Sequence, residues 1–214
     1  LWARGRLIAC LERPLIMGVV NVTPDSFYDG GRHIEPERAV THALELVEQG
    51  ADILDVGAES TRPGATPVGE EEERTRLLPV VTELARRVAV PISVDTTKSA
   101  VAQAALDAGA SIVNDVSALR FDPRMASVVA RSGAGVVLMH MKGTPLTMQE
   151  DPCYRDVVED VVEFLEERMR VAMEAGISKL NIMLDPGIGF GKLLEHNLEL
   201  LNRLGELTKL DRPL

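Results

Sequence analysis

The sequence contains few cysteines, and they are far apart. Cys10 and Cys153 are the only two in 214 residues, and neither belongs to a C-x-x-C pattern. A disulfide framework or a zinc site requires several cysteines or histidines at short spacing, so the sequence favours neither. Two isolated thiols are typical of a reducing compartment, and we expect a cytoplasmic protein in which both cysteines are bystanders.

Long apolar runs and a surplus of positive charge are also missing. Arg4, Arg6, Glu12 and Arg13 interrupt the first residues before any run reaches the length of a signal peptide or a membrane span. Lysine and arginine number 23 against 33 aspartate and glutamate, which gives a formal charge of −10 and no basic stripe. We therefore expect neither a membrane nor a nucleic acid as a partner.

Two kinds of catalytic pattern are absent as well. No nucleophile is paired with a base in the Ser-His-Asp manner, and no histidine or cysteine cluster is present to hold a transition metal. The run Gly187-Ile-Gly-Phe-Gly-Lys192 is one residue too short for a P-loop and has no Ser or Thr after the lysine. Its backbone N–H groups could still meet a phosphate, but we expect recognition and charge stabilisation rather than covalent catalysis.

What is present is a pattern that recurs along the chain. A helical stretch, a glycine, a short apolar run and a polar residue follow one another in four copies, at 49–55, 108–114, 132–138 and 175–181. The glycine lies where a helix must stop and turn into a strand, which commonly requires a left-handed residue. The pattern predicts alternating βα units, and a chain with 45% apolar residues can bury one full core, so we expect a single domain over 1–214.

Six strands are predicted, and the first, at 15–20, lacks alternation and reads as buried on both faces. Helices are expected between them, for example at 37–49 and 158–172. Polar residues close every strand rather than one switch point, which favours an α/β fold of the (β/α)8 TIM-barrel class with about six units present. Arg212-Pro-Leu214 reads as the entrance to a seventh strand, so units 7 and 8 are inferred to be absent from these residues. The predicted strand centres are Ile16, Ile53, Ser93, Val113, Val137 and Met183.

Carboxylates and amides dominate the predicted carboxyl ends of the strands, where barrels bind their ligands. An aspartate can accept two parallel hydrogen bonds from an N–C–N edge, and an asparagine offers both a donor and an acceptor to adjacent ring atoms. A flat nitrogen heterocycle would suit such a floor. The strand-end residues are Asn21, Asp55 with Glu59, Asp95, Asn114 with Asp115, Met139 with His140, and Asp185.

Several of these residues also have a purely structural interpretation. Asp95, or a threonine after it, could cap a helix, and Asp185-Pro-Gly187 could be only a turn. His140 is expected to be a hydrogen-bonded strand-end residue rather than a metal ligand. The acidic run from Glu70 to Glu73 is expected in the first turn of a helix, where negative charge is favourable, with no further role.

Five motifs in the same order resemble those of bacterial dihydropteroate synthases, a pterin-binding TIM-barrel family. The resemblance spans nearly the whole chain and implies a magnesium-dependent transferase of folate biosynthesis that sulfonamides inhibit. Such an enzyme makes 7,8-dihydropteroate and diphosphate from 6-hydroxymethyl-7,8-dihydropterin diphosphate and 4-aminobenzoate, and it is commonly a homodimer. The motifs are Asn21-Val-Thr-Pro-Asp-Ser-Phe27, Glu59-Ser-Thr-Arg-Pro-Gly64, Asp95-Thr-Thr-Lys98, Asn114-Asp115 and Asp185-Pro-Gly-Ile-Gly-Phe-Gly-Lys192.

The resemblance implies a role for each matching residue. Asn21 would be the magnesium ligand near the diphosphate, and the loop of Asp25, Phe27 and Asp29 would close over 4-aminobenzoate. With Asp95 and Asp185, these three loop residues form the implied catalytic set. The implied substrate-binding residues are Thr61, Arg62, Asp95, Asn114, Met139, Asp185, Gly189 and Phe190.

Two rival functions stay open at this point. A pterin-binding methyltransferase would share the ring-binding floor but not the first two loops, and a non-catalytic pterin-binding module would share the floor alone. The family also carries a lysine-bearing loop after strand seven and an Arg-x-His motif at strand eight, and neither occurs within 1–214. Whether Arg62 faces the diphosphate or the benzoate carboxylate is likewise open.

Overall fold

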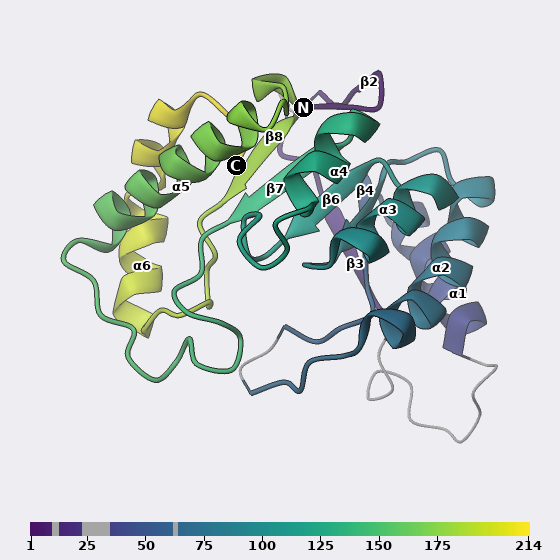
Figure 1. The fold of residues 1–214 in the computed structure, drawn as a ribbon, viewed down its shortest axis with the longest axis horizontal. Helices are drawn as coiled ribbons and strands as arrows, with labels where there is room; N and C mark the ends of the chain where they lie inside the picture. The colour runs from purple at the N-terminus through teal and green to yellow at the C-terminus, as the bar shows by residue number, and fades with distance from the viewer. Residues whose placement is uncertain (10–12, 23–34, 62–63) are drawn as a thin grey trace.

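The computed structural model describes residues 1–9, 13–22, 35–61 and 64–214 and has a six-stranded parallel sheet at its centre (Figure 1). Each strand pairs with the next one in the chain. A doubly wound sheet reverses its strand order at a switch point and this sheet does not, so the predicted barrel class is confirmed. The strands are β3 (Met17–Asn21), β4 (Ile53–Gly57), β5 (Ile92–Asp95), β6 (Ile112–Asp115), β7 (Gly135–Met139) and β8 (Ile182–Asp185).

Helices follow the strands and cover the outer face of the sheet. In Figure 1, α1, α2 and α3 lie along one flank, and α5 and α6 lie along the opposite one. Helix α2 packs against both α1 and α3, as expected when successive βα units are neighbours. The helices are α1 (Glu35–Glu48), α2 (Glu70–Arg87), α3 (Ser99–Ala108), α4 (Met125–Ser132), α5 (Val157–Glu174) and α6 (Leu194–Asn202), with 3-10 helices η2 (Lys179–Asn181) and η3 (Leu204–Leu210).

The four repeated glycines have the backbone conformation that the pattern predicts. Gly50, Gly109, Gly133 and Gly176 have φ angles of 103°, 121°, 64° and 95°. Each lies just after a helix, where the positive φ lets the chain leave the helix axis and enter the next strand. The repeat in the sequence is therefore a repeat of helix ends.

The two faces of the sheet bury different sets of side chains. On the outer face, residues such as Leu54 and Val94 belong to one large core shared with the helices. On the inner face, Ile53, Ile112 and Val137 form a smaller core at the amino ends of the strands. This inner core is closed by the hairpin of β1 (Trp2–Ala3) and β2 (Arg6–Leu7), with Leu1 and Ile8 packed into it.

The expectation that the first strand is buried on both faces is wrong. Burial alternates along β3: Gly18 and Val20 are buried, whereas Val19 is 53% exposed. Among the described residues, β3 pairs with one strand, β4. Uniformly apolar strands can be buried on both faces, but tertiary position decides whether they are.

The segment before the last residue lies where a further strand would begin. The backbone N–H of Leu184 in β8 donates to the carbonyl of Pro213 (2.9 Å), as that of Leu54 in β4 donates to Pro91 just before β5 (3.0 Å). Pro213 thus stands beside β8 as Pro91 stands beside β4. The organisation of 1–214 as one domain remains a prediction, and no helix within the described residues is both long and apolar enough to cross a membrane.

Candidate active site at the carboxyl ends of the strands

The strands bring three of the predicted ring-binding residues to one face of the sheet. Asp95 and Asp185 end β5 and β8, and Asn114 precedes the last residue of β6. Asp95 is directly opposite Asn114 in the strand register, and Met139 is directly opposite Asp185. Because side chains alternate along a strand, residues paired in this way point to the same side, which here is the inner face at the carboxyl ends.

Asp55 lies beside this group, closer to the middle of its strand. It lies on the inner face of β4, is 5% exposed, and its Oδ2 accepts a hydrogen bond from Nδ2 of Asn114 (3.1 Å). The Oδ1 of Asn114 is buried and has no hydrogen-bond partner among the described residues. Buried polar atoms are nearly always paired, so an unpaired amide oxygen beside two carboxylates is suited to a ligand N–H group. Sequence reasoning noted Asp55 at a strand end but assigned it no role.

The register also explains the glycine at the end of β4. Gly57 is opposite Asp95, and a Cβ placed on Gly57 would lie 3.3 Å from the Cβ of Asp95 and 3.5 Å from its Oδ2. That spacing is tight, so a larger residue at this position would press on the carboxylate. The small residue leaves Asp95 room beside β4.

Burial makes the carboxyl groups of this site unusually reluctant to ionise. It raises the pKa of Asp55, Asp95 and Asp185 above the ordinary aspartate value. For Asp95, the negative charges of Asp55 and Glu73 push the pKa further up. For Asp185, the N–H of Gly187, which donates to Oδ1 at 2.7 Å, partly opposes the rise in pKa. Clustered carboxyl groups of this kind favour a ligand that brings N–H donors or positive charge.

An apolar wall stands beside the carboxylates. Met139 at the end of β7 is 3% exposed and packs in a small cluster with Val116, Met141 and Met148, against which Phe190 leans. The structure thus brings together Met139 and Phe190, two of the residues assigned to substrate binding, although their contact with a ligand remains a prediction. A flat ring could lie along this wall with its polar edge toward the aspartates.

His140 has the structural role expected for it. Its Nδ1 accepts a hydrogen bond from the Nζ of Lys192 (2.9 Å), and its ring meets Phe164 edge to face at 4.9 Å. Burial and the nearby charge of Lys192 lower the pKa of His140 to about 3, so the ring is neutral at physiological pH. No group of three or more acidic, histidine or cysteine side chains suited to a metal occurs in the described part of the chain.

Asn21 is the residue assigned to magnesium. It ends β3, is exposed on the inner face, and is opposite Gly57 in the register. A single amide oxygen fits Mg²⁺, because this ion keeps several water ligands and is usually held by one or two protein groups together with substrate phosphates. The residue is therefore compatible with a metal that shares its ligands with a diphosphate, but it does not form a protein cage.

Two structural alternatives are wrong. Helix α3 begins at Ser99, whose N–H donates to Oδ2 of Asp122 (2.9 Å), so Asp95 does not cap this helix. Glu73 does more than favour the first turn of α2, because it is fully buried and its Oε2 accepts from Nζ of Lys98 at 2.6 Å. The ion pair with Lys98, 25 residues away in the sequence, gives Glu73 this role.

Lys98 also anchors the loop that follows β4. Its Nζ donates to Oε2 of Glu59 (2.5 Å), while Oε1 of Glu59 accepts from the N–H of Val68 (2.9 Å). These bonds tie the two ends of the loop to each other and to the start of α3. Thr61, one of the residues assigned to substrate, is half-buried within this loop.

Other assigned residues fall away from the group or outside the described structure. The N–H of Gly189 donates to Oδ1 of Asn197 (2.8 Å), so it is not free for a phosphate in this conformation. Asp115 accepts from the N–H groups of Ser117 (2.8 Å) and Leu119 (2.9 Å) and does not belong to the ring floor. The residues outside the described ranges are Asp25, Phe27, Asp29 and Arg62.

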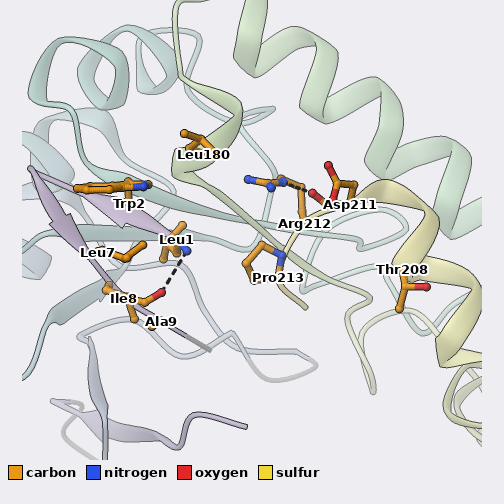
Figure 2. A pocket seen from close by; sticks show the side chains of 10 residues that line it. All are labelled: Leu1, Trp2, Leu7, Ile8, Ala9, Leu180, Thr208, Asp211, Arg212 and Pro213. Carbon is orange, nitrogen blue, oxygen red and sulfur yellow. Dashed lines mark hydrogen bonds between the residues drawn. The ribbon is translucent and has the colours of Figure 1, made fainter. Parts of the chain in front are cut away.

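Two hollows at the amino ends of the strands hold none of the assigned residues. Figure 2 shows the first, a cavity of about 430 Å³ between the N-terminal hairpin and η3, lined by Trp2, Leu7 and Pro213 among others. The second, of about 650 Å³, is lined by Met17 and Ile53, the first residues of β3 and β4. The carboxylates and amides of the candidate site lie at the opposite ends of the strands.

Comparison with known proteins gives a consistent result. A family model described as pterin binding enzyme matches residues 17–214. A dihydropteroate synthase of Escherichia coli is 47% identical over 214 residues, which are 100% of this chain and 75% of the relative. A Xanthomonas albilineans dihydropteroate synthase solved with 4-aminobenzoic acid is 51% identical with a TM-score of 0.90, covering 98% of this chain and 74% of the other.

A Yersinia pestis dihydropteroate synthase solved with a sulfonamide drug agrees as well, with a TM-score of 0.92, 46% identity, and coverage of 100% of this chain and 77% of the other. These matches cover 98 to 100% of this chain, so the matched region includes the strands that carry the carboxylate and amide floor. The chain belongs to the pterin-binding enzyme family and, within it, to the dihydropteroate synthases.

Proposed function

We propose that this chain joins 6-hydroxymethyl-7,8-dihydropterin diphosphate to 4-aminobenzoate, giving 7,8-dihydropteroate and diphosphate. The observation that carries the proposal is the convergence of Asp95, Asn114 and Asp185 on one face at the carboxyl ends of the strands. Relatives solved with 4-aminobenzoic acid and with 7,8-dihydropteroate support the substrate pair.

The floor matches the edge of a pterin ring in hydrogen-bonding terms. The 2-amino group and the adjacent ring N–H of a pterin form an N–C–N edge, and the carboxylate of Asp95 or Asp185 can accept two hydrogen bonds from it. Asn114 offers Oδ1 to a further N–H group, while its Nδ2 is held by Asp55. Met139 and Phe190 would then cover the apolar faces of the ring.

The carboxylates would also assist the reaction through charge. The bond between the pterin methylene carbon and the diphosphate oxygen breaks, and its electron pair leaves with diphosphate. Positive charge on the methylene carbon spreads into the ring, where the carboxylates of Asp95 and Asp185 stabilise it. The amine nitrogen of 4-aminobenzoate then forms the new C–N bond and loses a proton.

The remaining assignments concern the diphosphate and the second substrate. Asn21 would hold Mg²⁺, which when bound neutralises charge on the departing diphosphate. Thr61 and Arg62 would contact substrate from the loop that Lys98 anchors. The catalytic loop of Asp25, Phe27 and Asp29 would close over 4-aminobenzoate and exclude water.

We also place the protein in the cytoplasm as a homodimer with small-molecule substrates, and with no nucleic acid or membrane partner. The net charge of −10 and the resemblance support this setting. Sedimentation of the purified protein measures the dimer: a mass near that of one chain at micromolar concentration would rule it out.

An assay of product formation tests the function. The protein is incubated with both substrates and Mg²⁺, and 7,8-dihydropteroate is measured by mass spectrometry. We expect product from wild type, and from Asp185→Asn a turnover lower by about 10²-fold or more together with weaker pterin binding. Binding of pterin without consumption of 4-aminobenzoate would instead indicate a binding module, and unchanged kinetics in Asp185→Asn would remove that residue from the site.

A further inference from the structure

We propose that Lys192 is a positioning residue for pterin binding: its buried ammonium group holds the loop of residues 185–191 against the end of β7 and so sets the positions of Asp185 and Phe190. The inference rests on the proposed function and adds a residue to which no role has been assigned. Lys192 is 3% exposed, although lysine is among the residues least often buried.

The contacts of the ammonium group come from both sides of the loop. Nζ donates to the carbonyl of Gly187 (2.9 Å) and to that of Phe190 (3.0 Å), which belong to the loop itself. It also bonds Nδ1 of His140 (2.9 Å) and approaches the carbonyl of His140 at 3.4 Å, just beyond the end of β7. One side-chain nitrogen therefore ties the loop to the neighbouring strand end.

The loop approaches that strand end so closely that Gly187 can be nothing larger. Its φ angle is 68°, and a Cβ at this position would lie 2.0 Å from the carbonyl oxygen of His140. At the same residue, the N–H group donates to Oδ1 of Asp185 (2.7 Å). The hydrogen bonds of Gly187 thus connect Asp185 on one side with Lys192 on the other.

The chemistry of lysine suits this place. Several neutral acceptors surround one point, and an ammonium group presents three donors from a single compact atom, whereas arginine spreads its donors over a planar fork. Nζ bonds backbone carbonyls and a neutral imidazole, and its charge partly opposes the rise in the pKa of Asp185, so we place Lys192 beside the site and not among the groups that touch the reacting atoms. It acts through the groups it holds, which belong to the pterin half of the site.

This division predicts which substrate loses affinity. Without the ammonium group, the carbonyls of Gly187 and Phe190 lose their shared donor, and the loop can shift relative to β7. Asp185 and Phe190 then lose their fixed spacing to Met139, and pterin binds less well. The described residues in these contacts are His140, Gly187 and Phe190, and none of them is assigned to 4-aminobenzoate, so we expect the affinity for that substrate to change little.

Three substitutions in the full-length protein test the inference. Lys192→Met keeps the length of the side chain but removes the donors. Lys192→Arg keeps the charge in a different shape. Lys209→Met is the matched control, because its side chain is 72% exposed on η3 and, within the described residues, forms an ion pair with Glu206 of the same helix. Calorimetry with 6-hydroxymethyl-7,8-dihydropterin gives the pterin Kd, and the assay at saturating pterin diphosphate gives the KM for 4-aminobenzoate.

We expect the pterin Kd to rise about tenfold or more in Lys192→Met and by a smaller factor in Lys192→Arg, with a KM for 4-aminobenzoate within about twofold of wild type in both. Lys209→Met should match wild type throughout. Unchanged pterin Kd in a folded Lys192→Met would overturn the inference, as would an equal loss for both substrates, which indicates a merely structural role. If Lys192→Met does not fold, Lys192→Arg decides in the same way. Failure of wild type to bind pterin would instead contradict the proposed function.

Discussion

At the scale of single residues, the site combines groups that are costly to bury. Asp55, Asp95 and Asp185 lie close together, and burial raises the pKa of each. Such an arrangement weakens the folded state in the absence of a ligand, because ionised carboxylates are poorly solvated there, although the charge of Lys192 partly opposes the rise in the pKa of Asp185. The same groups favour ligand binding, because a ligand with several N–H donors would form hydrogen bonds with them.

Asp95→Asn is expected to stabilise the empty protein at neutral pH. Because the pKa of Asp95 is raised on folding, the folded state binds more protons than the unfolded state between about pH 4 and the folded pKa, so wild-type stability falls as pH rises through that range. The variant lacks this titration and should lose less stability between pH 5 and pH 7. Urea unfolding at both pH values measures the change in the free energy of unfolding. A larger loss of stability in the variant than in wild type would contradict the predicted direction.

Lys192 should produce the opposite pH dependence in a higher range. Burial lowers its pKa to about 7, so between about pH 7 and pH 10 the unfolded state binds more protons and wild-type stability rises with pH. Lys192→Met cannot show this rise. The difference in unfolding free energy between the two proteins, followed at pH 7, 8.5 and 10, should therefore increase; a constant difference would mean that the lysine titrates as an exposed one does.

At the scale of elements, helix ends and loop anchors determine where the site residues stand. The glycine repeat sets the passage from helix to strand, and Lys98 joins the start of α3 to α2 and to the loop after β4. The helix-ending glycines lie away from the ring floor, so their loss should change stability more than specificity. Lys98 anchors the loop that carries Thr61 and pairs with Glu73, whose charge raises the pKa of Asp95, so its loss should affect the site as well as stability.

Lys98→Met should destabilise the protein by about 3–5 kcal/mol, because it leaves the buried carboxylate of Glu73 without its partner. Replacing Glu73 by Leu in the same protein removes the stranded charge and should recover part of the loss. Urea unfolding of Lys98→Met, Glu73→Leu and the double variant gives the three free energies of unfolding that, with wild type, complete a double-mutant cycle. Equal stability of Lys98→Met and wild type would show that the contact is not formed in solution.

A pair of glycine substitutions separates backbone strain from crowding. Gly50→Ala places a side chain at positive φ in open space and should cost about 1–2 kcal/mol. Gly109→Ala adds an overlap, since its Cβ would lie 2.5 Å from that of Ala85, and should cost about 1–3 kcal/mol more. Thermal unfolding ranks the two variants, and both should keep the pterin Kd of wild type. A reversed order would mean that helix α2 shifts to accommodate the added methyl group without loss of stability.

At the scale of the whole molecule, local patterns predicted the order of strands and helices better than they predicted contacts. The helix-ending glycines and the six strands follow from short-range rules, and all six strands are present. The placement of Asp95, Asn114 and Asp185 on one face follows from alternation along each strand. Positions that depend on the neighbouring strand were harder to predict.

The wrong or missing predictions share one physical cause. Glu73 was assigned only to the first turn of its helix, yet its partner is Lys98, and Asp55 was given no role, yet it bonds Asn114 from 59 residues away. Val19 is likewise exposed on β3, which pairs with one strand, β4, among the described residues. Each depends on which segments become neighbours in the fold, which short-range periodicity does not contain.

A crystal structure of the protein with 6-hydroxymethyl-7,8-dihydropterin diphosphate is the most direct test of the ring floor. We expect the N–C–N edge of the pterin within hydrogen-bonding distance of Asp185 or Asp95, an N–H group of the ring on Oδ1 of Asn114, and the ring beside Met139. A pterin bound in a hollow at the amino ends of the strands, or away from all three polar residues, would contradict it.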